Sequence, residues 1–245
     1  MRKTLVIAVT LIFALSIISA ASAKGGGKAP QMEFVEEVFV DYKTPTHAGP
    51  GPHPTAESDD FALTMGGIKW PNESSVKYSV VTTGCTDDCT DAVSEVNGSL
   101  DAWELGVLTF TQDNGTPDEN PCTGVGNTVT WSAIDGDGGA LAFASVCRNV
   151  ATKTIVGFRI VYDSGDAWSD SGDAEKLDIR NIGTHEAGHV MGLGHTNKPA
   201  SGCLTMYNFS VEEETQKRTL GLGDKLGMDL LYATGDLSGG PGCGS

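Results

Sequence analysis

Hydrophobic residues recur at helical spacing in a few long segments of the chain and at strand spacing in several short ones. Between residues 90 and 105, Val93, Val96, Leu100 and Trp103 follow helical intervals, which predicts a helix. Two further helices are expected over residues 174–193 and 223–232. Strands are expected at residues 76–82, 108–111, 128–131, 141–146 and 156–162. This order of elements predicts an α+β fold, arranged as an α/β sandwich.

The first 23 residues have the pattern of a secretory signal peptide. Arg2 and Lys3 precede an apolar run, and the small residues Ala21-Ser22-Ala23 follow it. The alternative is an uncleaved membrane anchor, but the run is short for a spanning helix and the cleavage pattern follows it directly. No later segment is apolar enough to span a membrane. We therefore expect cleavage after Ala23 and a secreted, extracellular protein without a membrane attachment.

The rest of the chain divides by composition. Residues 24–60 are rich in Gly, Pro, Lys and His, which indicates a flexible leader or a short pro-segment. Residues 61–233 have the pattern of a folded domain, and residues 234–245 form a loop-like C-terminal tail. We expect one catalytic or binding domain between two irregular ends, and a monomer.

Acidic residues outnumber basic ones strongly. The formal net charge is −16, and removing residues 1–23 takes away two basic residues and no acids, which gives −18. Such a surface repels nucleic acid and anionic membranes, and it suits a soluble protein that binds hard cations. A solvated acidic surface adapted to salt explains the same charge.

Six cysteines in an exported chain indicate up to three disulfides. The pairing that we expect is Cys85–Cys89, Cys122–Cys147 and Cys203–Cys243. A thiolate metal site is the alternative, but the close pair of Cys85 and Cys89 has no second close pair to complete it.

The segment from Thr184 to His195 carries the strongest chemical signal. His185 and His189 are four residues apart, so on a helix both imidazoles leave the same face and can bind one ion. Glu186 can reach a water on that ion. Gly192 can end the helix and turn the chain back, which lets His195 supply a third nitrogen. Three protein ligands leave one position open, as in catalytic zinc sites.

The full pattern H-E-x-x-H-x-x-G-x-x-H, with Met206 in a later turn, resembles the metzincin metalloproteases. Thr196 after the third histidine, Lys69-Trp70-Pro71-Asn72 and residues 223–232 are similar to the matrixins, the matrix-metalloprotease family, over most of residues 61–233. The resemblance implies a catalytic domain with a twisted mixed sheet, two long helices, a zinc cleft and a C-terminal helix. Met206 would form the Met-turn beneath the zinc.

The resemblance also implies a structural calcium site. Its ligands would come from two acidic loops, namely Asp135, Gly136, Gly138, Ala140, Asp163 and Asp166. Ordinary acidic turns are the alternative. Matrixins usually hold a second, structural zinc near this loop, but the corresponding positions here are Thr128, Thr130, Phe143 and Val161, so we expect one zinc only. The leader has no cysteine, so the family's cysteine switch cannot operate here.

The expected function is therefore that of a secreted zinc-dependent endopeptidase acting on polypeptides. A metal-activated water would attack the peptide bond, with Glu186 as the general base. The resemblance implies that the substrate lies extended along residues 141–146, and that Tyr207 lines the specificity pocket together with residues 208–220. Two alternatives keep the zinc: a non-proteolytic zinc-binding or adhesion module, and a hydrolase of another bond. The sequence does not indicate a substrate preference.

Overall fold

A computed structural model describes residues 33–43, 58–72, 74–113, 115, 117–123 and 126–238. The expected signal peptide, Cys243 and the end of the C-terminal tail lie outside the described residues. Among the residues that are described, no helix is long and apolar enough to cross a membrane.

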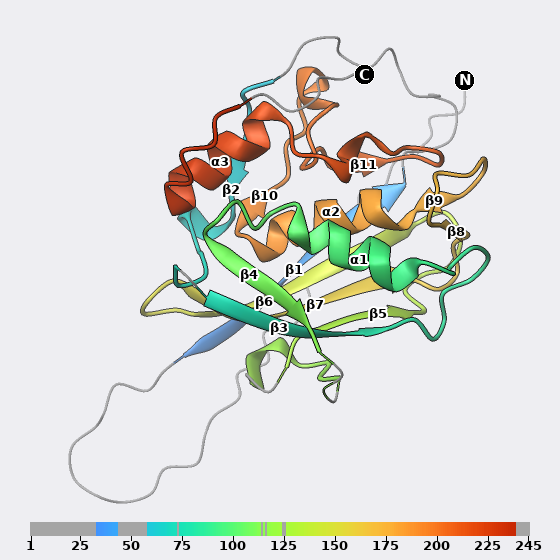
Figure 1. The fold of residues 1–245 in the computed structure, drawn as a ribbon, viewed down its shortest axis with the longest axis horizontal. Helices are drawn as coiled ribbons and strands as arrows, with labels where there is room; N and C mark the ends of the chain where they lie inside the picture. The colour runs from blue at the N-terminus through green and yellow to red at the C-terminus, as the bar shows by residue number, and fades with distance from the viewer. Residues whose placement is uncertain are drawn as a thin grey trace, which may run out of the picture. The chain divides into compact units, whose positions relative to one another are not determined.

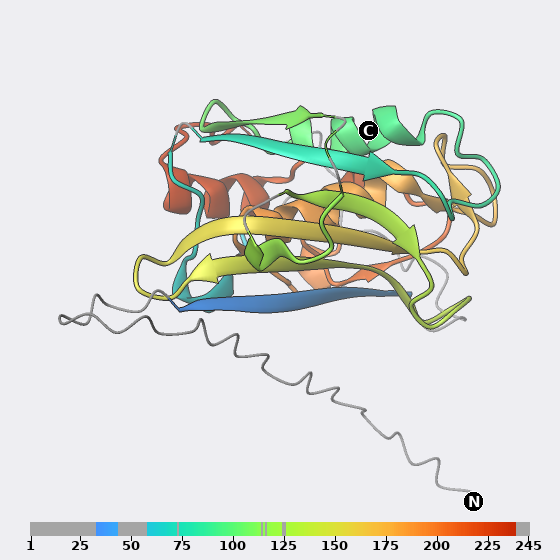
Figure 2. The same cartoon turned by 90° about the horizontal axis from the view of Figure 1, so that it is seen from below.

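A mixed sheet of seven strands, in the order β11-β1-β6-β7-β5-β3-β4, carries the fold (Figure 1). Its strands are β1 Phe34–Lys43, β3 Ser74–Val81, β4 Leu108–Gln112, β5 Thr128–Ser132, β6 Ala140–Asn149, β7 Thr154–Asp163 and β11 Phe209–Ser210. The strands from β7 to β4 pair in parallel, whereas β6 is antiparallel to both of its neighbours. Figure 2 shows the main strands stacked one above another, with β1 at the lower edge. The expected mixed sheet is confirmed.

The remaining elements are three helices and several short pieces. The helices are α1 Ala92–Asp101, α2 Ile179–Val190 and α3 Leu222–Tyr232. The short strands are β2 Ala62–Leu63, β8 Trp168–Ser169, β9 Leu177–Asp178 and β10 Leu193–Gly194, and the 3-10 turns are η1 Thr64–Gly66, η2 Pro121–Thr123, η3 Pro199–Ser201 and η4 Gln216–Arg218. The two-stranded pairs β2–β10 and β8–β9 stand apart from the main sheet.

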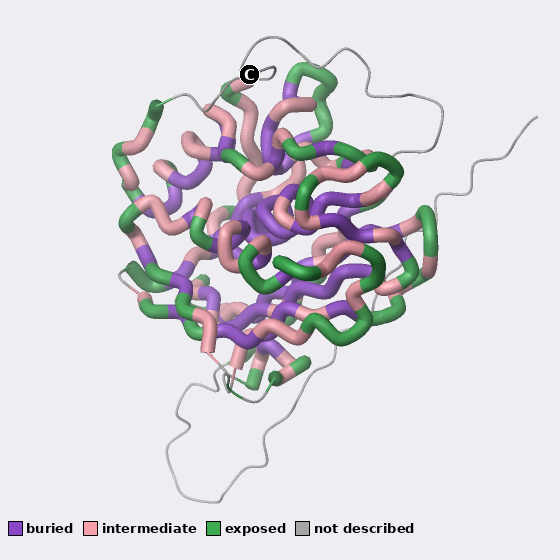
Figure 3. The backbone as a smooth tube through the Cα atoms, turned by 45° about the vertical axis from the view of Figure 1, so that its right-hand side comes forward, coloured by how far each residue is buried: buried purple, intermediate pink, exposed green. Residues whose placement is uncertain are grey.

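Helices α1 and α2 lie side by side over one face of the sheet, and the core fills the space between these layers (Figures 1 and 3). Trp103 is fully buried just after α1 and donates its indole N–H to the Thr184 carbonyl on α2 at 2.8 Å. Tyr162 of β7 donates its hydroxyl to the Ile179 carbonyl at the start of α2. Every residue of α2 but one is buried, so this helix is held by its surroundings on nearly all sides.

Strand β1 is an ordered element within residues 24–60, the segment expected to be a flexible leader or a short pro-segment. Residues 34–43 pair with β6 over almost their whole length, from Phe34 opposite Asn149 to Tyr42 opposite Ala140. The segment FVEEVFVDYK is rich in β-branched and aromatic residues and alternates in burial, which is the pattern of a half-buried strand. The Gly- and Pro-rich sequence on both sides of it obscured this local pattern.

Helix α2 begins later than the helical pattern predicts. Asp178 accepts a hydrogen bond from the Asn181 N–H at 2.8 Å and caps the helix, so residues 174–178 precede it. Leu177 and Asp178 pair with β8 instead. Good helix formers at 174–176 extended the prediction, but tertiary pairing overrides their propensity.

Two of the expected disulfides are confirmed. Cys85 is bonded to Cys89, and Cys122 in η2 is bonded to Cys147 in β6. The expected bond between Cys203 and Cys243 involves a residue outside the described ranges.

A candidate metal centre of three histidines

Helix α2 and the turn after it bring the three histidines together. His185 and His189 lie one turn apart on α2 and are fully buried. Gly192 follows with a φ of +96°, which L residues rarely adopt, and a Cβ there would come within 2.2 Å of the Ile68 carbonyl oxygen. The chain therefore reverses at glycine, pairs through β10 with β2, and returns His195 to the other two rings.

The three rings present their Nε2 atoms to one another. The Nε2 of His195 lies 3.0 Å from the Nε2 of His185 and 3.0 Å from that of His189. The Nδ1 atoms of His185 and His189 lie 2.7 and 2.9 Å from the carbonyl oxygens of Thr205 and Leu193. Carbonyls accept only, so each Nδ1 carries the proton and each Nε2 offers a lone pair. Three converging lone pairs repel one another unless a cation lies between them, so the donor set fits a zinc ion.

The surroundings keep these imidazoles neutral. Burial lowers the pKa of His185 and His189 well below the usual histidine value, and the neighbouring positive charges lower it further. Burial and then the charge of Lys217 lower the pKa of His195 to about 4. A histidine must be neutral to bind a metal, so the site is prepared for one at ordinary pH.

Glu186 lies beside the histidines with nothing to bond. It is fully buried, and neither of its carboxylate oxygens has a hydrogen-bond partner in the described structure. Burial, followed by the negative charge of Asp41, raises the pKa of Glu186 well above the usual glutamate value. A buried, unpaired carboxylate of raised pKa next to a cation site has the properties of a general base.

The loop beneath the site is held by helix α3. Thr205, whose carbonyl meets His185, and Met206 both donate their backbone N–H groups to the Asp224 carboxylate, at 2.8 and 3.2 Å. Met206 is buried, and a Cβ on Gly188 of α2 would come within 2.1 Å of its sulfur. Met206 therefore packs directly under the histidine-bearing helix. Tyr207 follows it, half-buried, and its ring contacts Phe209.

Strand β1 also contacts the group formed by the histidines and Glu186. The ring of Phe39 stacks on that of His189, with 4.6 Å between the ring centres. Two residues further on, the carboxylate of Asp41 has an oxygen within 4.8 Å of ligand atoms of both His185 and Glu186. Asp41 is fully buried, and burial raises its pKa to about 6 even though Lys217 lowers it.

A positive side chain stands behind Asp41. Ser210 of β11 donates its hydroxyl to the Asp41 carboxylate at 2.8 Å, and Lys217 donates from Nζ to the Ser210 hydroxyl at 2.6 Å. Lys217 is fully buried and also donates to the Phe209 carbonyl at 2.8 Å. Sequence reasoning missed Asp41 and Lys217. The alternation of β1 could have pointed to Asp41, but nothing in the sequence around Lys217 indicates a buried lysine.

The residues expected to bind calcium lie together, but their carboxylates mostly serve the backbone. Asp163 accepts N–H groups from Ile134, Asp135, Gly136 and Gly165, and these bonds lower its pKa although burial opposes them. The Asp135 carboxylate accepts the Ala140 N–H, and Asp166 accepts the N–H of Gly138.

Neither Asp135, Asp163 nor Asp166 belongs to a group of side chains close enough to hold a metal. The two groups of that kind among the described residues are His185 with His189 and His195, and Asp41 with His185 and Glu186. The sequence predicts no second zinc, because four positions lack suitable ligands. These positions lie in the strands β5, β6 and β7, namely Thr128, Thr130, Phe143 and Val161.

Comparisons with known proteins agree with this geometry. The family model described as Matrixin matches residues 69–233. Matrix metalloproteinase-16 of Homo sapiens is 25% identical over 186 residues, which is 72% of this chain and 29% of that protein. Metalloendoproteinase 4-MMP of Arabidopsis thaliana is 31% identical over 80 residues, which is 31% of this chain and 22% of that protein. The chain thus spans less than a third of the length of these curated relatives.

Proposed function

The chain belongs to the matrixin family, and from this premise we propose that it is a zinc-dependent endopeptidase. The observation that carries the proposal is the convergence of three Nε2 lone pairs beside the unpaired Glu186 carboxylate. His185, His189 and His195 would hold the zinc, which would supply a Lewis acid that polarises the scissile carbonyl and lowers the pKa of water.

Glu186 performs the proton transfers. Its buried carboxylate takes the proton of the attacking water and later passes it to the departing amine, which needs a pKa raised toward neutrality. Because the three buried histidines are neutral, they do not compete with Glu186 in these proton transfers. No serine or cysteine nucleophile is needed, because water itself attacks.

Paired measurements of metal content and cleavage test this function. Wild-type protein should bind about one zinc per chain and cleave an unstructured protein such as casein. Glu186→Ala should keep the zinc and lose cleavage by at least about a hundredfold, in the range typical of a lost general base. Glu119→Ala, at a highly exposed glutamate, is the matched control and should retain both.

The alternative of a non-proteolytic zinc-binding module gives a different result in the same experiment. Such a module binds zinc and leaves casein intact, and Glu186→Ala changes nothing that it does. Full activity in Glu186→Ala would contradict the assigned general base while leaving the zinc site in place.

The leader is proposed to act as a pro-segment through β1. Strand β1 lies along β6, which includes the residues expected to bind an extended substrate. It is held by the ion pair of Glu37 with Arg148 toward one end and by the ion pairs of Lys43 with Asp137 and Glu212 at the other. Phe39 and Asp41 cover the metal centre between these ends. A substrate strand on β6 has to displace β1.

The starting rate of casein cleavage tests this proposal. Asp41→Ala in the full chain should raise it several-fold over that of the wild type, because β1 loses its buried contact with Ser210. Val38→Ala, at an exposed position on the same strand, is the control and should behave as the wild type does. Equal starting rates for all three proteins would remove the pro-segment role.

Structural calcium is also proposed, for the loops at Asp135 and Asp163. The Oδ2 of Asp166 supports it, because this buried carboxylate oxygen has no hydrogen-bond partner in the described structure. Burial raises the pKa of Asp166 to about 6, although the Gly138 N–H and the charge of Lys43 lower it. Calcium should raise the thermal midpoint of the wild type above its value in a calcium chelator, and Asp166→Asn should remove most of that gain.

We further propose that the protein is secreted, which detection in the culture medium would test.

A further inference from the structure

We propose that the enzyme prefers an acidic substrate residue next to the cleaved bond, and that Lys217 and Ser210 determine this preference. This inference rests on the endopeptidase function proposed above. The site concerned is the Asp41 site, which comprises Asp41 itself, Ser210, Lys217 and Glu214.

The position of β1 makes Asp41 a stand-in for a substrate side chain. Strand β1 is antiparallel to β6 and parallel to β11, so it lies between two strands that an incoming extended peptide would also meet. Asp41 is the residue of β1 whose carboxylate lies within 4.8 Å of both His185 and Glu186 ligand atoms. A substrate residue in its place is therefore adjacent to the reacting peptide bond.

The Asp41 site is built from donors. Lys217 donates to the Ser210 hydroxyl at 2.6 Å, and this hydroxyl in turn donates to the Asp41 carboxylate at 2.8 Å. All three side chains are fully buried, so their charges and dipoles act in a weakly screening environment. An apolar side chain in place of Asp41 would take the carboxylate acceptor away from the Ser210 hydroxyl and one negative charge away from the surroundings of Lys217.

Glu214 is ion-paired with Lys217 and offsets part of its positive charge. It lies 3.8 Å from Lys217, but one of its oxygens accepts the Val211 N–H and the other accepts from Gln216. Its carboxylate is thus fixed by hydrogen bonds within its own loop.

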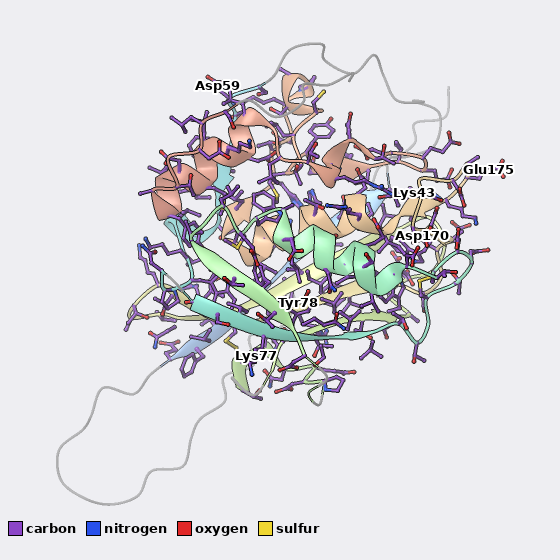
Figure 4. All side chains as sticks on the ribbon, in the orientation of Figure 1. Lys43, Asp59, Lys77, Tyr78, Asp170 and Glu175 are labelled. Atoms are coloured by element: carbon purple, nitrogen blue, oxygen red, sulfur yellow. A yellow bond between two sulfur atoms is a disulfide. The ribbon has the colours of Figure 1, made fainter. Side chains whose placement is uncertain are left out.

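The outer end of β1 continues the charge pattern. Lys43 lines a pocket together with Asp137, Asp166, Glu175 and Glu212, and it forms ion pairs with Asp137 and Glu212. Figure 4 labels Lys43 and Glu175 on the same side of the molecule. The strand that lies here thus has an acidic residue, Asp41, at the metal centre and a basic residue, Lys43, two positions later. We expect a substrate strand to fit best with the same order of charges. The central acid is the stronger requirement, because its site is fully buried whereas the Lys43 pocket opens to the surface.

Cleavage-site mapping tests the inference directly. The full chain is incubated with a mixture of peptides of known sequence, and the cut bonds are read by mass spectrometry. Asp and Glu should be enriched about tenfold or more at one position next to the cut, which is the discrimination expected of one charged, buried hydrogen bond. Lys217→Met keeps the aliphatic stem and should abolish the enrichment, whereas Lys225→Met, an ion-paired lysine on α3, should keep it.

The outcomes separate this inference from the function beneath it. No cleavage of any peptide by wild type or by Asp41→Ala protein would count against the endopeptidase. Cleavage with apolar residues on both sides of the cut, or acidic enrichment that survives Lys217→Met, would overturn the acidic preference alone.

A double-mutant cycle tests the inference when the Lys217→Met protein does not fold or when β1 prevents cleavage. In a Glu186→Ala background, hydrogen exchange of the β1 amides is compared for Asp41→Asn, Ser210→Ala and both together. Each single change should speed exchange about tenfold, and the double change no more than the stronger single one, because the two groups share one bond. Val38→Ala combined with Ser210→Ala should be additive. Additive effects for Asp41 and Ser210 would mean that the site does not recognise the acid.

Discussion

Single backbone positions hold the metal centre together, and Gly192 is the most sensitive of them. Its φ of +96° allows the reversal that returns His195, and its missing Cβ leaves room for the Ile68 carbonyl. The sequence alone indicated this role, because a glycine seven residues after His185 is where the chain has to turn.

Gly192→Ala should destabilise the fold by about 2 kcal/mol or more, from left-handed strain together with overpacking. Denaturant unfolding measures the loss, and zinc affinity should decrease with it. Gly106→Ala is the matched control, since Gly106 has a φ of +75° but no atom within 4 Å of an added Cβ. Equal losses in both variants would mean that the contact with Ile68 has no energetic weight.

Asp224 is a second determinant at the same scale, and the sequence did not reveal it. Its carboxylate accepts the N–H groups of Thr205, Met206 and Gly221, so one side chain joins the start of α3 to the loop under His185. Asp224→Asn replaces one acceptor oxygen by a donor and should cost roughly 1–3 kcal/mol of unfolding free energy. Asp229→Asn, five residues further along α3, should cost far less. A change in zinc affinity in Asp224→Asn that is absent in Asp229→Asn would show that Asp224 positions the zinc-binding loop.

At the scale of elements, the two described disulfides differ in the length of chain that they close. Cys122 and Cys147 are 25 residues apart and tie η2 to β6, whereas Cys85 and Cys89 are 4 apart. Replacing the first pair by serines should cost roughly 3 kcal/mol and the second roughly 2 kcal/mol, because the longer loop gains more entropy on unfolding. Thermal unfolding of the two double variants ranks them. The opposite ranking would point to local strain or packing rather than chain entropy.

The elements also mark how far sequence reasoning reaches in this chain. The central strands and α3 were predicted close to their bounds, because their hydrophobic spacing is regular, whereas the helix expected over residues 90–105 ends at Asp101. The histidine triad was predicted completely, since its geometry follows from helical spacing and one glycine. Strand β1 and the small pairs β2–β10 and β8–β9 were missed, because each is defined by partners distant in sequence. Lys217 was missed because burial of a charged residue depends on bonds to Phe209 and Ser210 that no local pattern encodes.

Across the whole molecule, the dominant physical property is the excess negative charge of −16. Like charges repel one another in the folded state, so salt should raise stability by screening them. The thermal midpoint should rise between about 0.01 and 0.15 M NaCl, where the screening length decreases from roughly 30 to 8 Å, and then level off. Scanning calorimetry over a salt series measures this. A thermal midpoint that keeps rising in proportion to the NaCl concentration up to 1 M would indicate exclusion of ions from the protein surface instead of charge screening.

The pairing of β1 with β6 has a consequence for which proteins can be digested. The two strands stay in register from Phe34 to Asp41, so this part of the chain is fully extended over about 25 Å. A polypeptide that takes the same place has to give up any helix or compact turn along that length. Tightly folded domains offer no such stretch without first unravelling, whereas linkers, termini and denatured chains offer it at once. The proposed endopeptidase would therefore act on loosened polypeptide, with conformation deciding first which chains are cut and the proposed acidic preference deciding where.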